Sequence, residues 1–168
     1  MDGRYAILFV CLGNICRSPA AEGVFRHLLA RYEAATGGAG AIGIDSAGTI
    51  GFHAGNPPDA RMRAVAARRG YDLDGAARAV RVDDFRRFDL ILGMDANNVS
   101  ELRDMKPRDS RAEVALFATY TMGVKADVPD PYYGGSDGFE TVLDLLEKGC
   151  RKLIARLEHD GLLTQVRQ

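Results

Sequence analysis

The spacing of hydrophobic residues changes several times along the chain, and short apolar runs alternate with stretches of helical period. Short runs that are mostly apolar and rich in β-branched or aliphatic residues are typical of strands buried on both faces of a parallel sheet. Such runs predict four strands, at Ala6–Val10, Ile42–Ser46, Asp89–Met94 and Val114–Phe117.

Apolar residues three and four apart predict helices between and after these strands. In the first helix we expect Ser18 as the N-cap and Pro19 at the first helical position, because both residue types favour those places. The last predicted helix is the most regular, with one apolar face from Phe139 to Leu157 and an end at Gly161. Three further helices are predicted at Asp59–Arg69, Asp83–Phe88 and Asp95–Met105.

Two segments predict long loops. Gly48–Pro58 is rich in Gly and Pro, and Thr119–Asp137 is long, which in a compact domain usually marks a functional segment. Strand and helix alternate throughout, so we predict an α/β fold with a parallel sheet, in a single domain of residues 1–168. Because the carboxyl ends of parallel strands share one edge, the loops after the first, second and fourth strands should meet there around a ligand.

The segment Cys11–Ser18, C-L-G-N-I-C-R-S, lies between the first strand and its helix. Amides at a helix N-terminus have no intrahelical acceptor, and the helix dipole adds partial positive charge there. Gly13 and Asn14 tolerate the left-handed backbone that a curled loop needs, and Arg17 offers a planar pair of donors to phosphate oxygens. The segment therefore predicts an anion nest that favours the thiolate form of Cys11, which could attack phosphorus.

A cysteine followed six residues later by an arginine is a weak pattern by itself. Cys150 and Arg156 have the same spacing, but they lie within the last predicted helix. Amides there are already bonded to carbonyls four residues back, so Cys150 should be a core residue. Cys11 could also be a small buried residue at a strand end, and its context of strand, glycine-containing loop and capped helix is what favours a nucleophile.

Displacing a basic oxygen from phosphorus requires a proton donor. Asp130 stands in the second long loop, before a proline and two tyrosines, and is the candidate acid. An Asp-Pro pair also forms ordinary turns, and Asp127 is the nearest competitor for the role. Phe52, Tyr132 and Tyr133 are candidate walls for an aryl ring, although simple loop packing would also explain them.

Charge, hydropathy and cysteine content limit the possible binding partners of the protein and its cellular compartment. The formal net charge is -1 and no long run of like charge occurs, so we expect no nucleic-acid partner. No apolar stretch is long enough to span a membrane, and the run Tyr5–Leu12 is too short for a signal peptide, so we expect no membrane insertion and a cytoplasmic location. Three cysteines do not make a disulfide framework, and His27, His53 and His159 show no metal-ligand spacing.

Several motifs together resemble one family. VCLGNICRSPAAE (Val10–Glu22) is similar to the opening of the low-molecular-weight protein tyrosine phosphatases. The resemblance covers nearly the whole chain, through IDSAGT (Ile44–Thr49), GMD (Gly93–Asp95), DPYYGG (Asp130–Gly135) and FETV (Phe139–Val142). It implies a three-layer fold, with a four-stranded parallel sheet flanked by helices on both faces and a phosphate-binding loop after the first strand.

The resemblance also implies roles for individual residues. Cys11 would be the nucleophile, Arg17 the phosphate clamp and Asp130 the general acid, with no metal and no cofactor. The substrate would be a phosphotyrosine-containing protein, and we expect a monomer or weak dimer. The rest of the loop would complete the phosphate site: Leu12, Gly13, Asn14, Ile15, Cys16 and Ser18, with Asn14 shaping the loop and Ser18 hydrogen-bonding the thiolate.

The resemblance implies three details around the site. Tyr132 and Tyr133 would line the entrance, and Phe52 would match the aromatic residue that the family usually has after the second strand. Cys16 would protect oxidised Cys11 through a disulfide, although simple packing of Cys16 behind the loop is the alternative. Many members carry a histidine that supports the phosphate loop in the segment matching Gly70–Arg78, and this chain has none there.

Three other functions use related designs. An arsenate reductase should relay electrons through further cysteines, but beyond Cys16 only Cys150 remains, on a helical core face. A phosphocarrier of sugar transport would not need Asp130. A nucleotide-binding loop would carry Gly-Lys-Ser/Thr, which the pair Arg17-Ser18 does not match.

Overall fold

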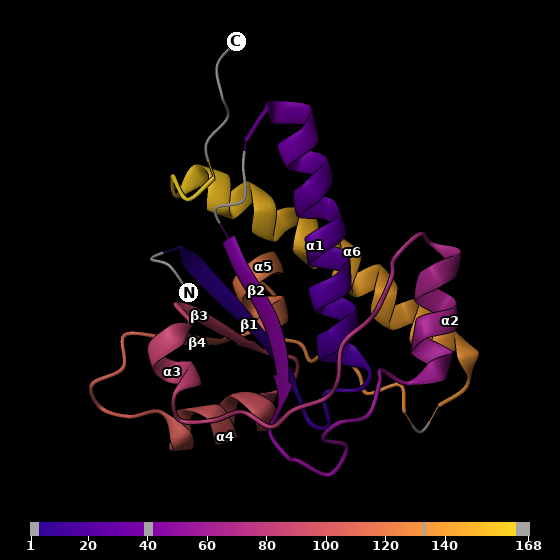
Figure 1. Ribbon diagram of the computed structural model, residues 1–168, viewed down its shortest axis with the longest axis horizontal. Coiled ribbons are helices and arrows are strands. Elements are labelled where there is room, and N and C mark those ends of the chain that lie inside the picture. Colours follow the sequence, from indigo (N-terminus) through magenta and orange to yellow (C-terminus); the bar gives the residue numbers. More distant parts are fainter. Residues whose placement is uncertain (1–3, 39–41, 133, 164–168) are drawn as a thin grey trace.

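The computed structural model describes residues 4–38, 42–132 and 134–163, which form a four-stranded parallel sheet with helices on both faces (Figure 1). The order of strands across the sheet is β2-β1-β3-β4. The predicted α/β fold is confirmed, and every predicted strand overlaps an observed one. The strands are β1 (Tyr5–Cys11), β2 (Ile42–Gly48), β3 (Leu90–Gly93) and β4 (Glu113–Leu116).

The chain adds strands on opposite sides of β1: β2 pairs with one edge of β1, and β3 pairs with the other. The connections that leave the sheet on either side of such a point diverge, and a crevice opens at the carboxyl ends of the strands. The segment that begins at Cys11, the last residue of β1, lies at this point. The sheet order therefore places the predicted phosphate loop where α/β proteins bind ligands.

Both faces of β1 are buried, which explains its continuous apolar run. Ile7 and Phe9 face one hydrophobic core, and Ala6, Leu8 and Val10 face a second core on the other side of the sheet. The first core is covered by α1 (Arg17–Thr36), α2 (Ala60–Arg68), α5 (Phe117–Met122) and α6 (Ser136–His159). The second is covered by α3 (Asp84–Arg87) and α4 (Ala96–Met105).

The last helix, α6, packs along α1 and buries the face that the sequence pattern predicts. Leu143, Leu146 and Cys150 on that face are completely buried. Burial raises the pKa of the Cys150 thiol, so this cysteine stays protonated at neutral pH. Cys150 is a core residue, as its place within a helix indicates.

The predicted start of α1 is wrong. We expected Ser18 as the N-cap, but the helix begins at Arg17 and Cys16 occupies the cap position without a side-chain hydrogen bond. Ser18 is fully buried, and its hydroxyl lies 3.0 Å from the Cys11 sulfur instead of bonding the helix amides. Because no side chain caps α1, the first backbone amides of this helix have no capping acceptor.

The observed loop after β4 is also shorter than the predicted loop Thr119–Asp137. Its first residues belong to α5, which follows β4 without a break and ends at Gly123, where φ is 73°. Phe117 anchors this helix, because its buried ring packs against the ring of Phe9 in β1, with the two ring centroids 6.3 Å apart. Thr and Tyr are weak helix formers, so local propensity does not reveal α5.

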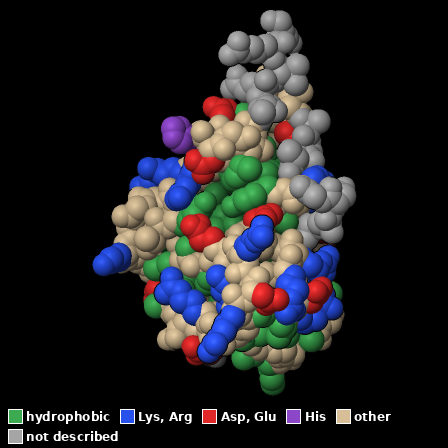
Figure 2. All heavy atoms as spheres, turned by 90° about the vertical axis from the view of Figure 1, so that its left-hand side faces the viewer, with side chains coloured by type: hydrophobic (Ala, Val, Ile, Leu, Met, Phe, Trp, Pro, Cys, Tyr) green, Lys and Arg blue, Asp and Glu red, His purple; other side chains and the backbone are tan. Residues whose placement is uncertain are grey.

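The surface carries charges of both signs. On the face shown in Figure 2, acidic and basic side chains are interspersed around a patch of hydrophobic side chains. Within the described residues, no helix has the length and apolar character needed to cross a membrane.

Candidate active site

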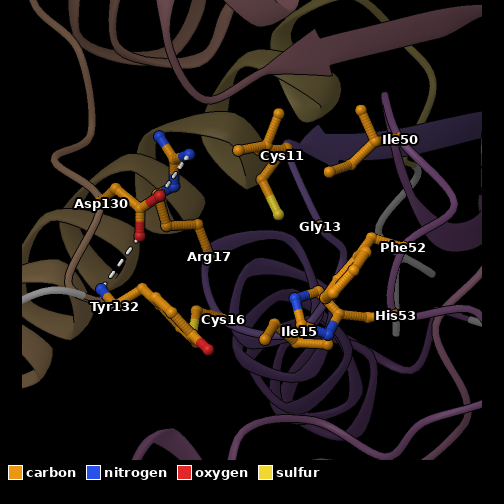
Figure 3. Close-up of a pocket in the computed structure, with 11 residues that line it drawn as sticks. Cys11, Gly13, Ile15, Cys16, Arg17, Ile50, Phe52, His53, Asp130 and Tyr132 are labelled. Atoms are coloured by element: carbon orange, nitrogen blue, oxygen red, sulfur yellow. Dashed lines mark hydrogen bonds and ion pairs between the residues drawn. The ribbon is translucent and has the colours of Figure 1, made fainter.

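A pocket of about 180 Å³ opens at the carboxyl edge of the sheet. Figure 3 shows the Cys11 sulfur pointing into it, with Arg17 and Asp130 on one side and Ile50, Phe52 and His53 on the other. Segments that follow β1, β2 and β4 thus meet at the carboxyl edge of the sheet, where the sequence predicted that these loops would meet around a ligand. The pocket is lined by Cys11, Leu12, Gly13, Ile15, Cys16, Arg17, Ile50, Phe52, His53, Asp130 and Tyr132.

The backbone of the loop after β1 presents donors to the pocket. The carbonyl oxygens of Cys11 and Leu12 turn away and accept hydrogen bonds from the amides of Thr49 and Ile50, at 2.9 and 3.0 Å. In the part of the chain that the structure describes, no protein oxygen accepts a hydrogen bond from the amides of residues 13–18. Free amides at a helix N-terminus make this loop a suitable cradle for an anion.

Two glycines allow close packing around this loop. Of the two residues expected to be left-handed, only Asn14 is, with φ of 57°. Gly13 is needed for a different reason, because a Cβ there would lie 2.8 Å from Cδ2 of His53. A Cβ at Gly48 would lie 2.8 Å from the carbonyl oxygen of Leu12. The pattern of the sequence does not show these contacts, which join segments far apart in the chain.

Buried hydrogen bonds connect Cys11 to the residues behind it. The Ser18 hydroxyl lies 3.0 Å from the Cys11 sulfur and accepts a bond of 2.8 Å from Nδ2 of Asn14. The backbone amide of Arg78 donates to Oδ1 of Asn14 at 3.0 Å. This amide contacts the loop from the segment where the family often has a histidine.

Arg17 is held from three sides. Its guanidinium donates to Oδ2 of Asp95 at 2.8 Å and to the carbonyl oxygen of Val128 at 3.0 Å, and it lies 3.5 Å from Asp130. Only 3% of its side chain is exposed. Such anchoring fixes the planar fork in one orientation beside the loop.

Asp95 has two roles. It caps α4 through a capping box with Asn98. Its other carboxylate oxygen binds Arg17, a contact that sequence reasoning missed because a helix cap already explains the residue.

Asp130 lies at the mouth of the pocket. Its Oδ1 accepts a 3.0 Å bond from the amide of Tyr132, and a third of its side chain is exposed. Asp127, the alternative acid, does not line the pocket, and its carboxylate accepts a 3.0 Å bond from the amide of Ala96 at the start of α4. The structure therefore places Asp130, and not Asp127, beside Arg17.

The walls of the pocket are apolar and aromatic. Phe52 is 84% exposed and meets His53 edge to face, with ring centroids 4.9 Å apart. Tyr132 stands on the other side, where Arg61 of α2 donates to its carbonyl oxygen at 3.2 Å. Ile50 and His53 were not predicted as site residues, because single residues in a Gly-rich loop carry no sequence pattern. Tyr133 lies outside the described residues.

Cys16 also lines the pocket, five residues after Cys11. Burial raises the pKa of the Cys16 thiol, and the nearby carboxylate of Asp59 raises it further, so Cys16 is a thiol at neutral pH. No group of three or more His, Cys, Asp or Glu side chains in the described ranges is arranged to hold a metal ion.

Comparisons with known proteins show the family to which the chain belongs. Residues 6–163 match the family described as low molecular weight phosphotyrosine protein phosphatase. A low molecular weight protein-tyrosine-phosphatase of Streptomyces coelicolor is 46% identical over 155 residues, covering 90% of this chain and 92% of the relative.

Solved structures show the same similarity. A protein tyrosine phosphatase from Entamoeba histolytica, with Hepes in its active site, is 42% identical with a TM-score of 0.85, over 94% of this chain and 99% of that one. A Drosophila arginine phosphatase is 28% identical with a TM-score of 0.83, over 90% and 97% of the two chains. With its sequence matched from the first strand to the end of the last helix, this chain belongs to the low molecular weight protein tyrosine phosphatases, a family of hydrolases.

Proposed function

We propose that the protein hydrolyses phosphotyrosine in proteins through a cysteinyl-phosphate intermediate on Cys11. The carrying observation is that Cys11, Arg17 and Asp130 line one pocket although they come from three separate segments of the chain. In the first step, the Cys11 thiolate attacks phosphorus, a P–S bond forms and the bond from phosphorus to the tyrosyl oxygen breaks.

The cradle and Asp130 supply the rest of the chemistry. The amides of residues 13–18 and the Arg17 fork hold the phosphoryl oxygens and balance their charge in the transition state. Asp130 donates its proton to the leaving tyrosyl oxygen. In the second step the Asp130 carboxylate accepts a proton from water, which attacks phosphorus, and the P–S bond breaks to release inorganic phosphate and the Cys11 thiolate.

The walls favour an aryl phosphate. Ile50, Phe52 and Tyr132 offer apolar surface on which a phenol ring can pack above the phosphate. A phosphoarginine would instead bring a guanidinium group, for which Asp130 is the one carboxylate among the described lining residues. Similarity to an arginine phosphatase makes this the alternative substrate to exclude.

The test is release of inorganic phosphate from peptides that differ only in the phosphorylated residue. With a chelator present and no added thiol, we expect phosphotyrosine to be preferred over phosphoserine and phosphoarginine by at least about 100-fold in kcat/KM. Preference for phosphoarginine would replace the proposed substrate. A requirement for added metal, or consumption of thiol in proportion to the phosphate released, would contradict the proposed mechanism.

Cys16 should protect the active site from oxidation. Peroxide converts the Cys11 thiolate to a sulfenic acid, and the Cys16 thiol can then condense with it, losing water and forming a disulfide. Brief peroxide treatment should inactivate the wild type, and added thiol should restore most of its activity. Cys16→Ser should be active before treatment but recover much less, because its sulfenic acid proceeds to sulfinic acid.

One control accompanies this experiment. Cys150→Ser removes a completely buried thiol that does not line the pocket, and it should recover like the wild type. Equal recovery of Cys16→Ser and the wild type would exclude Cys16 as the protecting thiol, and would leave the phosphatase proposal untouched.

A further inference from the structure

The side chain of Arg61, near the start of α2, contacts the segment that carries Asp130 and Tyr132. Its Nη2 atom donates a 3.2 Å hydrogen bond to the carbonyl oxygen of Tyr132. Its guanidinium carbon lies 5.4 Å from the centroid of the Tyr132 ring and 4.9 Å from that of Phe139, a buried residue of α6. Cations are attracted to aromatic rings at such distances. One side chain therefore holds both the backbone and the ring of Tyr132.

The same guanidinium is connected to the phosphate-binding loop through Asp59, the residue that caps α2. Arg61 donates from Nε to Oδ1 of Asp59 at 3.2 Å and from Nη2 to Oδ2 at 3.1 Å. The backbone amide of Asp59 donates in turn to the carbonyl oxygen of Ile15 at 2.7 Å. Arg61 therefore links the loop that contains the nucleophile to the segment that contains the acid.

The orientation of Asp130 depends on the segment that Arg61 holds. The amide of Tyr132 donates to Oδ1 of Asp130 at 3.0 Å, as Figure 3 shows, so a movement of Tyr132 also moves the carboxylate. A third of the Asp130 side chain is exposed, and its contact with Arg17 is long, at 3.5 Å. A general acid must lie within hydrogen-bond reach of the leaving oxygen, and a small misplacement costs much of the rate.

We propose that Arg61 is a positioning residue for the general acid, which fixes segment 130–132 over the phosphate-binding loop and keeps Asp130 within reach of the leaving oxygen. The inference rests on the proposed function, in which Asp130 donates its proton to that oxygen. Arg61 itself is not among the residues that line the pocket. Without Arg61, the segment loses a hydrogen bond and a ring contact, and Asp130 spends less time where it can protonate the leaving group.

Arg61→Ala should therefore slow the enzyme most where proton donation matters most. We expect kcat for phenyl phosphate to fall about tenfold, which is part of the loss that removal of Asp130 itself causes. For an aryl phosphate whose leaving group departs as a stable anion, the loss should be less than about twofold. An equal loss with both substrates would overturn the proposal, because a role in the pocket wall alone does not depend on the leaving group.

A double-variant cycle tests whether Arg61 acts through Asp130. In an Asp130→Ala background, Arg61→Ala should cause no further loss of kcat for phenyl phosphate, because no acid is left to position. A further loss of about tenfold in that background would overturn the proposal.

The single Asp130→Ala variant separates a failure of this inference from a failure of the proposed function. A uniform loss across leaving groups in that variant would remove Asp130 as the acid, and the role of Arg61 with it. A loss that depends on the leaving group in Asp130→Ala, together with a uniform loss in Arg61→Ala, would overturn the role of Arg61 alone.

Two further variants separate the geometry of the guanidinium from its charge. Arg61→Lys keeps the charge, but an ammonium group cannot reproduce the planar fork that bonds Asp59 and Tyr132 together. It should lose nearly as much as Arg61→Ala, and wild-type rates would overturn the proposal. Arg63→Ala is the matched control, because Arg63 is another exposed arginine of α2 that does not line the pocket. It should keep wild-type rates with both substrates, and a loss equal to that of Arg61→Ala would assign the effect to the charge of the helix and overturn the proposal.

Discussion

Replacing Cys11 with serine should lower phosphate release from an aryl phosphate on the order of 10⁴-fold or more. A serine hydroxyl in the same place is protonated at neutral pH and is a much weaker nucleophile than a thiolate. In the wild type, rapid quenching into denaturant during turnover should leave phosphate covalently attached to Cys11. Mass spectrometry of the peptide that contains Cys11 is the measurement.

Cys16→Ser is the matched control for this substitution. It makes the same chemical change in another buried thiol that lines the same pocket. It should keep most of the activity, because Cys16 has no part in the proposed phosphoryl transfer. Full activity of Cys11→Ser, or phosphate trapped on any other residue, would end the proposed mechanism.

Replacing Asp130 with alanine should cost on the order of 10²–10⁴-fold in kcat for phenyl phosphate, whose leaving oxygen must be protonated. The loss should shrink for an activated leaving group that departs as a stable anion. Plotting rate against leaving-group pKa for both enzymes measures this difference, because only a general acid makes the loss depend on the leaving group.

Asp127→Ala serves as the control for Asp130. It removes a carboxylate three residues earlier in the same segment, which bonds the start of α4 and lies outside the pocket. We expect little change in rate and no dependence on the leaving group. A uniform loss across leaving groups in Asp130→Ala would instead assign Asp130 a structural role, such as holding the Tyr132 amide.

Local signals were sufficient where neighbours in sequence determine the conformation. The apolar run of β1 and the glycine-containing loop that follows it predicted where the pocket-forming segment lies. The same reasoning separated Cys11 from Cys150, because an amide within a helix already has its hydrogen-bond partner.

Local reasoning failed where a residue had both a local and a remote partner. Ser18 is a good helix cap by type, but its hydroxyl is occupied by Cys11 and Asn14. Gly13 suits a left-handed turn by type, but it is needed because His53 packs against it. A remote contact can outweigh a local preference, since a capping bond contributes only about 1 kcal/mol.

The sequence by itself determined the kinds of chemistry present: a cysteine and an arginine in an anion-binding loop, an acid in a later loop, and the α/β fold that brings the two loops to one edge. Only the tertiary structure decided which side chains orient them. Arg17 is anchored by Asp95 and Val128, which lie 78 and 111 residues further along the chain. The direction of the Asn14 amide likewise depends on β2 and on the segment before α3. Hydrogen bonds require atoms to lie within about 3 Å of each other, and for residues so distant in sequence that proximity is set by how the whole chain packs.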